Sequence, residues 1–182
     1  QEVVFKFFRE HMKQVFYLLI GFLCITNMYA QHDVAAIEYN NKIVNEQTKI
    51  GEAILSFSSN PNAFSLAKLK EQAESSMSII KKMKAYKDDK QLLSAAKDMF
   101  KFYISISKKD YKELLYLVEN KEKYESNELT RKLNTLVKNI SAKEIPLDNA
   151  FQSAQKKFAE KYGFTLQKND LSDKLKDATK EN

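Results

Sequence analysis

The sequence predicts an all-α protein, an elongated antiparallel up-down bundle of four helices. The first observation is that only 3 glycines and 2 prolines occur among 182 residues, too few for the many turns of β-sandwiches and barrels. The second is that apolar residues recur every three or four positions over four long stretches. The third is that 43% hydrophobic and 30% charged residues are typical of a globular protein. A chain of this length is expected to form one domain.

Residues 1–30 are predicted to be a signal peptide with an upstream extension. Met12-Lys13 resembles a translation start, and the apolar run Val15–Thr26 follows it. At about 12 residues, this run has the length of a secretory signal and is short for a membrane-spanning helix. Ala30 supplies the small residue that precedes a cleavage site. An uncleaved membrane anchor and an apolar first core helix remain the alternatives.

Cys24 lies near the end of the apolar run, where bacterial lipoproteins carry their lipid attachment site. Phe22 and Leu23 occupy the places where such sites have small residues, which disfavours lipidation. Cleavage after Ala30 would leave a chain without cysteine, and therefore without disulfide or thiolate chemistry. His32 would be its single histidine, close to the new N-terminus.

The first two helices are predicted over residues 33–57 and from about residue 61 to Tyr86. Asp33 is the expected N-cap of the first helix, and Asn60-Pro61 has the form of an N-cap followed by proline at the first helical position. The expected core positions of these two helices are Ala36, Ile43, Ile50, Ile54, Phe57, Leu66, Leu69, Ala73, Met77 and Ile80.

One unbroken third helix is predicted over residues 89–120. Asp88-Asp89 is expected to supply its cap, with Gln91 three residues after Asp88 able to reach back as in a capping box. Its apolar stripe includes Met99, Phe100, Tyr103, Ile106, Tyr111 and Leu114. The β-branched residues Ile104 and Ile106 are expected to weaken its middle.

The fourth helix is expected to open at Ser126 and to carry a kink or a complete break at Pro146. Gly163 suits the end of the helix, and Phe164 can pack back against it. Residues 31–164 then form the bundle domain, and residues 165–182 form a flexible polar tail.

Two short motifs carry a resemblance to a known family. The motifs are Tyr39–Gln47, near the expected mature start, and Phe151–Phe164, near the end. The chain resembles a family of small exported all-helical bacterial surface proteins, often lipoproteins, of uncharacterised function. This resemblance implies an envelope location and a helical fold, and it implies no activity. The large residues before Cys24 depart from the lipoprotein pattern and put the mode of attachment in doubt.

The residues needed for common catalytic centres are missing from the expected mature chain. Di-iron bundles use Glu-x-x-His pairs, which do not occur here. No Ser-His-Asp or Cys-His set can be assembled, and 3 glycines leave no phosphate-binding loop. Methionine and tyrosine at helical spacing are expected in the core and not as haem ligands. We therefore expect no enzyme, no cofactor and no metal site.

A net charge of +6 raises the question of nucleic acid, but nearly all the basic residues are lysines spread along the chain. Arginine supplies most base readout and bidentate phosphate contacts, and only Arg9 and Arg131 occur. We expect no nucleic-acid partner. Dispersed lysines instead suit envelope components or anionic surfaces, such as lipid head groups or acidic glycans. Membrane contact is expected only through an uncleaved signal segment.

Polar residues inside the apolar stripes are the candidate site. Asn40, Gln47 and Gln155 fall at core positions, and Tyr39 lies beside them. Because an unpaired buried amide costs about 1–3 kcal/mol, these groups should find partners. They are expected to form a buried hydrogen-bond network that fixes helix register. The alternative is a polar pocket for a small ligand.

The predicted function is that of an exported non-catalytic bundle, acting in binding or structure at the bacterial cell envelope, in the periplasm or on the outer surface. The alternative is a carrier of an apolar or amphipathic small molecule in an inter-helical pocket. A carrier should have a continuous cavity lined by residues such as Phe100, Tyr103 and Phe158. A scaffold should be packed solid and expose an aromatic patch.

Overall fold

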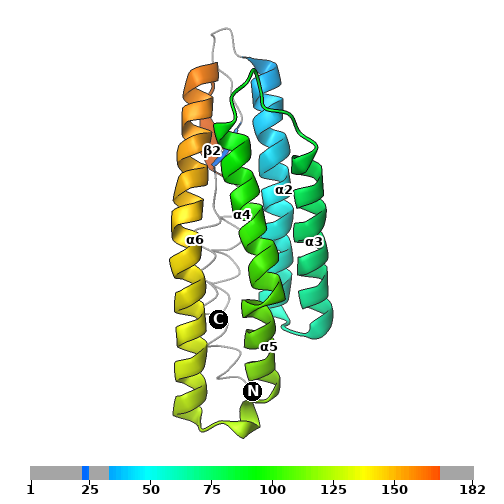
Figure 1. Ribbon diagram of the computed structural model, residues 1–182, viewed down its shortest axis with the longest axis vertical. Coiled ribbons are helices and arrows are strands. Elements are labelled where there is room, and N and C mark those ends of the chain that lie inside the picture. Colours follow the sequence, from blue (N-terminus) through cyan, green and yellow to red (C-terminus); the bar gives the residue numbers. More distant parts are fainter. Residues whose placement is uncertain (1–21, 25–32, 169–182) are drawn as a thin grey trace.

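A computed structural model describes residues 22–24 and 33–168, and it is all-α apart from one short pair of strands. Figure 1 shows an elongated molecule whose helices run along its long axis in alternating directions. Helix α2 (Val34–Ser59) packs on α3 (Ala63–Lys81), which packs on α4 (Gln91–Lys108). Helix α5 (Asp110–Glu119) continues the line of α4, and α6 (Ser126–Tyr162) runs beside both. The prediction of four helical stretches packed as neighbours is confirmed.

Helix α2 forms as its sequence pattern predicts. Asp33 is the N-cap, and its carboxylate accepts a hydrogen bond from the Ala36 backbone N–H at 3.2 Å. The predicted core residues Ile43, Ile50 and Phe57 are fully buried. The buried face of α2 therefore extends along the whole length of this helix.

The start of α3 differs from the prediction at Asn60-Pro61. Asn62, two residues later, is the N-cap, because it forms a capping box with Ser65. The Asn62 side chain accepts from the Ser65 N–H at 2.9 Å, and the Ser65 hydroxyl accepts from the Asn62 N–H at 3.2 Å. This reciprocal pair fixes the first turn at Ala63, so Pro61 lies outside the helix.

The prediction that α3 extends to Tyr86 is wrong, and of the predicted cap Asp88-Asp89 only Asp89 contacts the first turn of α4. The helix ends at Lys81, and a tight turn follows in which the Asp89 N–H donates to the Tyr86 carbonyl at 2.8 Å. Lys87 and Asp88 have positive φ, as the central residues of type I′ turns do, so Asp88 is not available as a cap. The carboxylate of Asp89 accepts from the Gln91 N–H instead.

The predicted third helix is broken at Lys109, whose φ of −122° and ψ of −75° are not helical. The break follows the serine-rich, β-branched stretch that was expected to be weak. The Ser107 hydroxyl donates to the Ile104 carbonyl at 2.9 Å, a local bond that competes with regular helix. The Lys109 N–H is shared between the carbonyls of Ser105 and Ile106, which tightens the last turn of α4.

Helix α6 is a single helix of 37 residues with Pro146 inside it, so the predicted alternative of a complete break is wrong. Proline removes one backbone hydrogen bond, but the helix continues because its apolar stripe is buried on both sides of Pro146, at residues such as Ile140 and Phe151. The Pro146 ring faces solvent. Tertiary packing therefore outweighs the local cost of the proline.

The end of α6 is as predicted, whereas the segment after it is not. Gly163 has φ +73°, and the Phe164 N–H donates to the Ala159 carbonyl at 3.0 Å, as in a Schellman motif. The side chain of Phe164 is buried. Strand β2 (Leu166–Lys168) lies within the predicted flexible tail and pairs antiparallel with β1 (Phe22–Cys24).

Several sequence predictions fall outside the described residues. These are the start at Met12, the cleavage site at Ala30, His32 and the tail beyond Lys168. Of the predicted signal segment, only Phe22–Cys24 is described. The signal peptide and the division into domains therefore stay predictions.

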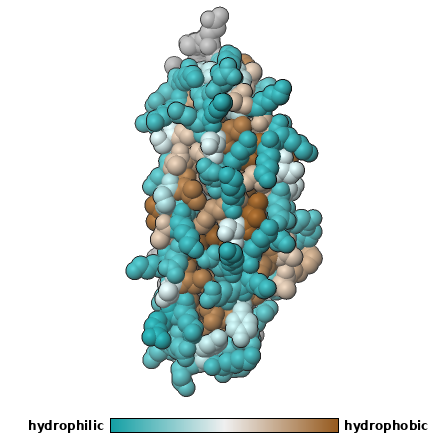
Figure 2. All heavy atoms as spheres, viewed as in Figure 1, coloured by the Kyte–Doolittle hydropathy of each residue, from teal (hydrophilic) through white to brown (hydrophobic). Residues whose placement is uncertain are grey.

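The surface is dominated by charged side chains. Figure 2 shows hydrophilic residues over most of one face, with narrow strips of hydrophobic residues between them. Within the described part, Phe64 and Tyr116 are the most exposed aromatic side chains, at 72% and 51%. No described helix has a stretch both long and apolar enough to span a bilayer.

Candidate functional site

Two of the four predicted site residues meet in the core. Asn40 on α2 and Gln155 on α6 are fully buried, and the Gln155 amide Nε2 donates to the Asn40 Oδ1 at 3.0 Å. The Asn40 Nδ2 donates to the Asn41 side chain at 3.3 Å. This amide pair joins α2 to α6, the first and last helices of the bundle.

Gln47, which was predicted to join this network, lies elsewhere on α2. Its amide Nε2 contacts the Met99 sulfur of α4 at 3.6 Å. Gln47 lies seven residues after Asn40, about two turns farther along the helix, and that separation puts it beside a different neighbour. The predicted set therefore divides between two contacts, one with α6 and one with α4.

Tyr39 belongs to an aromatic cluster at one end of the bundle. Its ring lies 5.4 Å from Tyr86 and 5.6 Å from Phe158, measured between centroids. Burial raises the pKa of its phenol to about 12, and the charge of Asp89 adds to the shift. The cluster also includes Tyr162 and joins α2, the α3–α4 loop and α6.

The rim of this cluster is an ion-pair network. The Tyr86 hydroxyl and the Lys87 ammonium each donate to Asp33 at 2.6 Å. These two hydrogen bonds lower the pKa of Asp33 to about 2. Lys161 reaches Asp89 at 2.9 Å and also lies over the Tyr162 ring. These contacts close the end of the bundle, although the buried Tyr39 hydroxyl has no hydrogen-bond partner among the described residues.

A second buried polar group, which the sequence did not predict, is formed by Glu144 and Asp148 on α6. Each is 1% exposed. The Tyr103 hydroxyl of α4 donates to the Glu144 Oε1 at 3.2 Å, and Gln152 donates to the Asp148 Oδ2 at 2.6 Å. Within the described residues, the Glu144 Oε2, the Asp148 Oδ1 and the hydroxyl of the fully buried Tyr111 have no hydrogen-bond partner.

Burial shifts the proton affinity of both carboxyl groups. The pKa of Glu144 is raised to about 8, chiefly by loss of hydration. The Tyr103 hydrogen bond lowers this pKa, and the charge of the neighbouring Asp148 raises it. Burial likewise raises the pKa of Asp148 to about 7. The pKa values of Tyr103 and Tyr111 are raised well above their usual range, chiefly by burial.

Glu46 on α2 shows how a buried carboxylate is otherwise satisfied in this fold. The Ser76 hydroxyl donates to its Oε2 at 2.8 Å, and the Lys49 ammonium lies 2.6 Å from its Oε1. The carboxylate therefore has a cation beside it. The ion pairs identified among the described residues give no such cation to Glu144 or Asp148. The ammonium of Lys143, the residue before Glu144, lies 3.4 Å from the Asp110 carboxylate instead.

A periodicity signal for the two acids was present in the sequence. Ile140, Glu144, Asp148, Phe151 and Gln155 follow one another at spacings of four, four, three and four, which places all of them on one helix face. The predicted interruption at Pro146 divided this stripe and hid the pattern.

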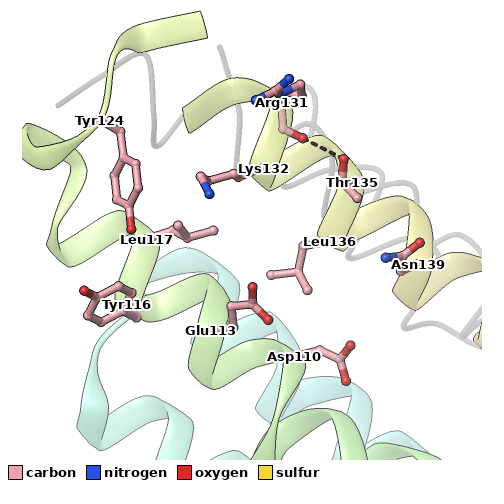
Figure 3. A pocket seen from close by; sticks show the side chains of 10 residues that line it. All are labelled: Asp110, Glu113, Tyr116, Leu117, Tyr124, Arg131, Lys132, Thr135, Leu136 and Asn139. Atoms are coloured by element: carbon pink, nitrogen blue, oxygen red, sulfur yellow. Dashed lines mark hydrogen bonds between the residues drawn. The ribbon is translucent and has the colours of Figure 1, made fainter. Parts of the chain in front are cut away.

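An open groove lies between α5 and α6, with a volume of about 440 Å³. Figure 3 shows Asp110 and Glu113 on α5, Lys132 and Asn139 on α6, and Leu117 and Leu136 between the two helices. Tyr116 and Tyr124 lie toward one end. The groove therefore combines an acidic wall, a basic wall, an apolar floor and exposed aromatic rings.

The three residues expected to line a carrier cavity are packed in the core. Phe100, Tyr103 and Phe158 are 0%, 1% and 2% exposed. They belong to the single hydrophobic cluster that runs through the helices. The α5–α6 groove has other lining residues and opens at the surface.

The described residues contain no cluster of three or more His, Cys, Asp or Glu side chains placed to hold a metal ion. No family model matches the chain, and comparison with curated proteins and with solved structures likewise finds no significant match. The resemblance to exported bacterial surface proteins, the expected lack of catalysis and the envelope location stay predictions.

Proposed function

We propose that this protein is an exported, non-catalytic helical bundle that acts in binding or structure at the bacterial cell envelope. The observation that carries the proposal is the position of the groove. Its charged walls and aromatic rings lie on the outside of the bundle, where a partner can reach them, while the core aromatic residues pack on one another. Such an arrangement supports recognition at the surface.

The surface chemistry supports an envelope partner. Lysines lie along every long helix, and Lys132 reaches from α6 over the Tyr124 ring at 5.5 Å. Arg131 and Lys132 give the α6 wall a positive charge. An anionic glycan or lipid head group would contact this wall, and its apolar part would contact Leu117 and Leu136.

The test places a photo-crosslinking amino acid at Tyr116, beside the groove, in the cells that make the protein. We expect crosslinks to an envelope component, because Tyr116 is half exposed and borders the groove. The matched control places the same amino acid at Lys70, an exposed position on α3. Equal crosslinking at both positions would contradict a binding role for the groove.

Export is tested separately by cell fractionation and by mass spectrometry of the protein purified from its own cells. We expect the protein in the envelope or secreted fraction, with Gln31 as the first residue and Cys24 absent. A cytoplasmic protein that retains residues 12–30 would contradict the proposal. The same spectrum reports any lipid attached at Cys24.

A second candidate function is that of a carrier for a small amphipathic molecule. The size of the α5–α6 groove favours it, because about 440 Å³ lies within the usual range of ligand pockets, roughly 300–1,000 Å³. Native mass spectrometry distinguishes the two functions. A bound small molecule that is lost in Leu136→Arg favours the carrier, and an unliganded mass favours the surface-binding bundle.

A further inference from the structure

The buried acids of α6 lie where three helices meet. Glu144 and Asp148 are one turn apart on α6, and α4 and α5 both pack against that helix. Tyr103 reaches Glu144 from α4, and the charge of Glu144 acts on the Tyr111 hydroxyl of α5. The carboxyl pair therefore lies at a junction that depends on close helix packing.

The charged neighbours do not neutralise this pair. Tyr103 on α4 and Tyr111 on α5 are neutral groups, and Asp110 on α5 adds a further negative charge near Tyr111. Lys143 on α6 lies 3.4 Å from Asp110. Helix α2 also contacts α6, but its buried Glu46 is turned to Ser76 of α3.

Unsatisfied oxygen atoms point to the protonation state. The Glu144 Oε2 and the Asp148 Oδ1 are buried without a hydrogen-bond partner among the described residues, as is the Tyr111 hydroxyl. A carboxylate in such surroundings would carry an uncompensated charge, whereas a protonated carboxyl group is neutral and can donate a hydrogen bond. Geometry and burial therefore both favour protons on this pair.

We propose that Glu144 and Asp148 form a buried two-proton site, and that loss of these protons in alkaline surroundings loosens the packing of α6 against α4 and α5. The raised pKa values, about 8 for Glu144 and about 7 for Asp148, agree with this role. Both groups keep their protons in the folded chain at a pH where the unfolded chain has lost them. The contribution of this pair to stability is therefore complete below about pH 4 and is lost as the pH rises toward 8.

The test compares urea unfolding of the full chain at pH 5.5 and 8.5. For the wild type, we expect the unfolding equilibrium constant to rise by about three to four orders of magnitude over this range, since the raised pKa values of about 8 for Glu144 and about 7 for Asp148 both contribute. In Glu144→Gln with Asp148→Asn, the amides stay neutral at both values. The rise should then shrink to less than about tenfold.

Glu160→Gln is the matched control, because Glu160 is an exposed acid on the same helix, 3.9 Å from Lys156. It should keep the full pH dependence of the wild type. If the double variant keeps that dependence as well, the two-proton site is wrong. In the wild type, the backbone amides between Ile140 and Phe151 should exchange faster at pH 8.5, after correction for intrinsic rates. Unchanged protection would contradict the proposed loosening of α6.

A direct measurement serves if the double variant fails to fold. Carbon-13 shifts of the Glu144 and Asp148 side-chain carboxyl groups report their protonation in the intact wild-type chain. We expect titration midpoints of about 8 for Glu144 and about 7 for Asp148. Midpoints near 4 for both groups would overturn the proposal.

Discussion

Asn40 and Gln155 form a specific contact between the ends of the chain, separated by 115 residues in sequence. Both side chains are amides, so each can donate and accept, and their 3.0 Å bond lies in the fully buried interior. Two leucines at these positions would pack without a hydrogen bond, and their contact would not depend on direction. The amide pair thereby favours one register of α6 against α2.

A double-mutant cycle tests this pair. Asn40→Leu alone should lower the free energy of unfolding by about 1–3 kcal/mol, because it leaves the Gln155 Nε2 without its Asn40 acceptor. Gln155→Leu should have a similar effect. The combined variant should be more stable than the sum of the two losses predicts, as measured by chemical unfolding. Strict additivity would show that the two amides are not coupled.

Asp33 gives a pH dependence of opposite sign to that of the buried acids. Its lowered pKa of about 2 means that the folded chain binds a proton there less readily than the unfolded chain. Its contribution is present above about pH 4 and is lost as the pH falls toward 2. Asp33→Asn keeps a capping side chain but removes the charge that pairs with Lys87.

The thermal midpoint of Asp33→Asn should therefore lie below that of the wild type at pH 7. The two midpoints should approach one another as the pH falls toward 2, where about half of the wild-type carboxylates are protonated. Glu71→Gln is a suitable control, since Glu71 is an exposed acid that pairs with Lys68 on α3. A difference that persists unchanged at pH 2 would assign the effect to the cap and not to the charge.

At the scale of elements, the helix ends depend on individual residues. Gly163 ends α6 with φ +73°, a conformation that residues with a Cβ adopt at a cost. A Cβ at this position would meet no atom within 4 Å, so the effect of adding one is confined to the backbone. The turn matters because it directs Phe164 back onto the Phe158 ring, 6.0 Å away.

Gly163→Ala should therefore lower the free energy of unfolding by about 1 kcal/mol through backbone strain alone. Ala142→Gly on the exposed face of α6 is the opposite substitution at a regular helical position, and it should cost about as much for a different reason, the lost helix propensity. Thermal unfolding of both variants checks this. A neutral Gly163→Ala would show that the end of α6 does not need a left-handed residue.

The elements were more predictable from the sequence than their boundaries. The core stripe of α2 from Ala36 to Phe57 follows periodicity alone, and periodicity depends only on which face is apolar. The starts of α3 and α4 differ from the prediction because two nearby residues competed for each cap. The end of α3 was missed because the tight turn at Lys87 and Asp88, which follows it, has no glycine to signal it. Local hydrogen bonds decided these ends.

At the scale of the whole molecule, the bundle is long and narrow. Helix α6 alone spans about 56 Å at 1.5 Å per residue. Figure 1 shows the α4–α5 line beside nearly its full length. The molecule thus places the aromatic cluster at one end and the α5–α6 groove toward the other.

Small-angle scattering in solution should report this shape. A compact chain of 182 residues has a radius of gyration of about 16 Å, and the elongated bundle should exceed that value at a monomeric molecular mass. A distance distribution with a long tail toward about 60 Å is the expected form. A symmetric distribution that ends well short of the length of α6 would contradict the arrangement.

The candidate site was only partly predictable at this scale. Periodicity placed Asn40 and Gln155 in the core, and the fold joined them. Periodicity could not show that Gln47 would contact Met99, since that contact depends on which helix lies beside each turn of α2. The groove has no signal in the chain, because its lining residues come from α5 and α6, which only the packing of the two helices brings together.

Pro146 has a consequence for how the molecule comes apart. Without an N–H at this position, the Ala142 carbonyl receives no bond from the next turn, within two residues of the buried Glu144. The missing backbone hydrogen bond therefore lies at the same place where loss of the two protons would loosen the packing of α6. We expect the longest helix to behave as two cooperative units, with the half toward Ser126 able to fray while the half anchored by Phe158 and Gln155 stays folded.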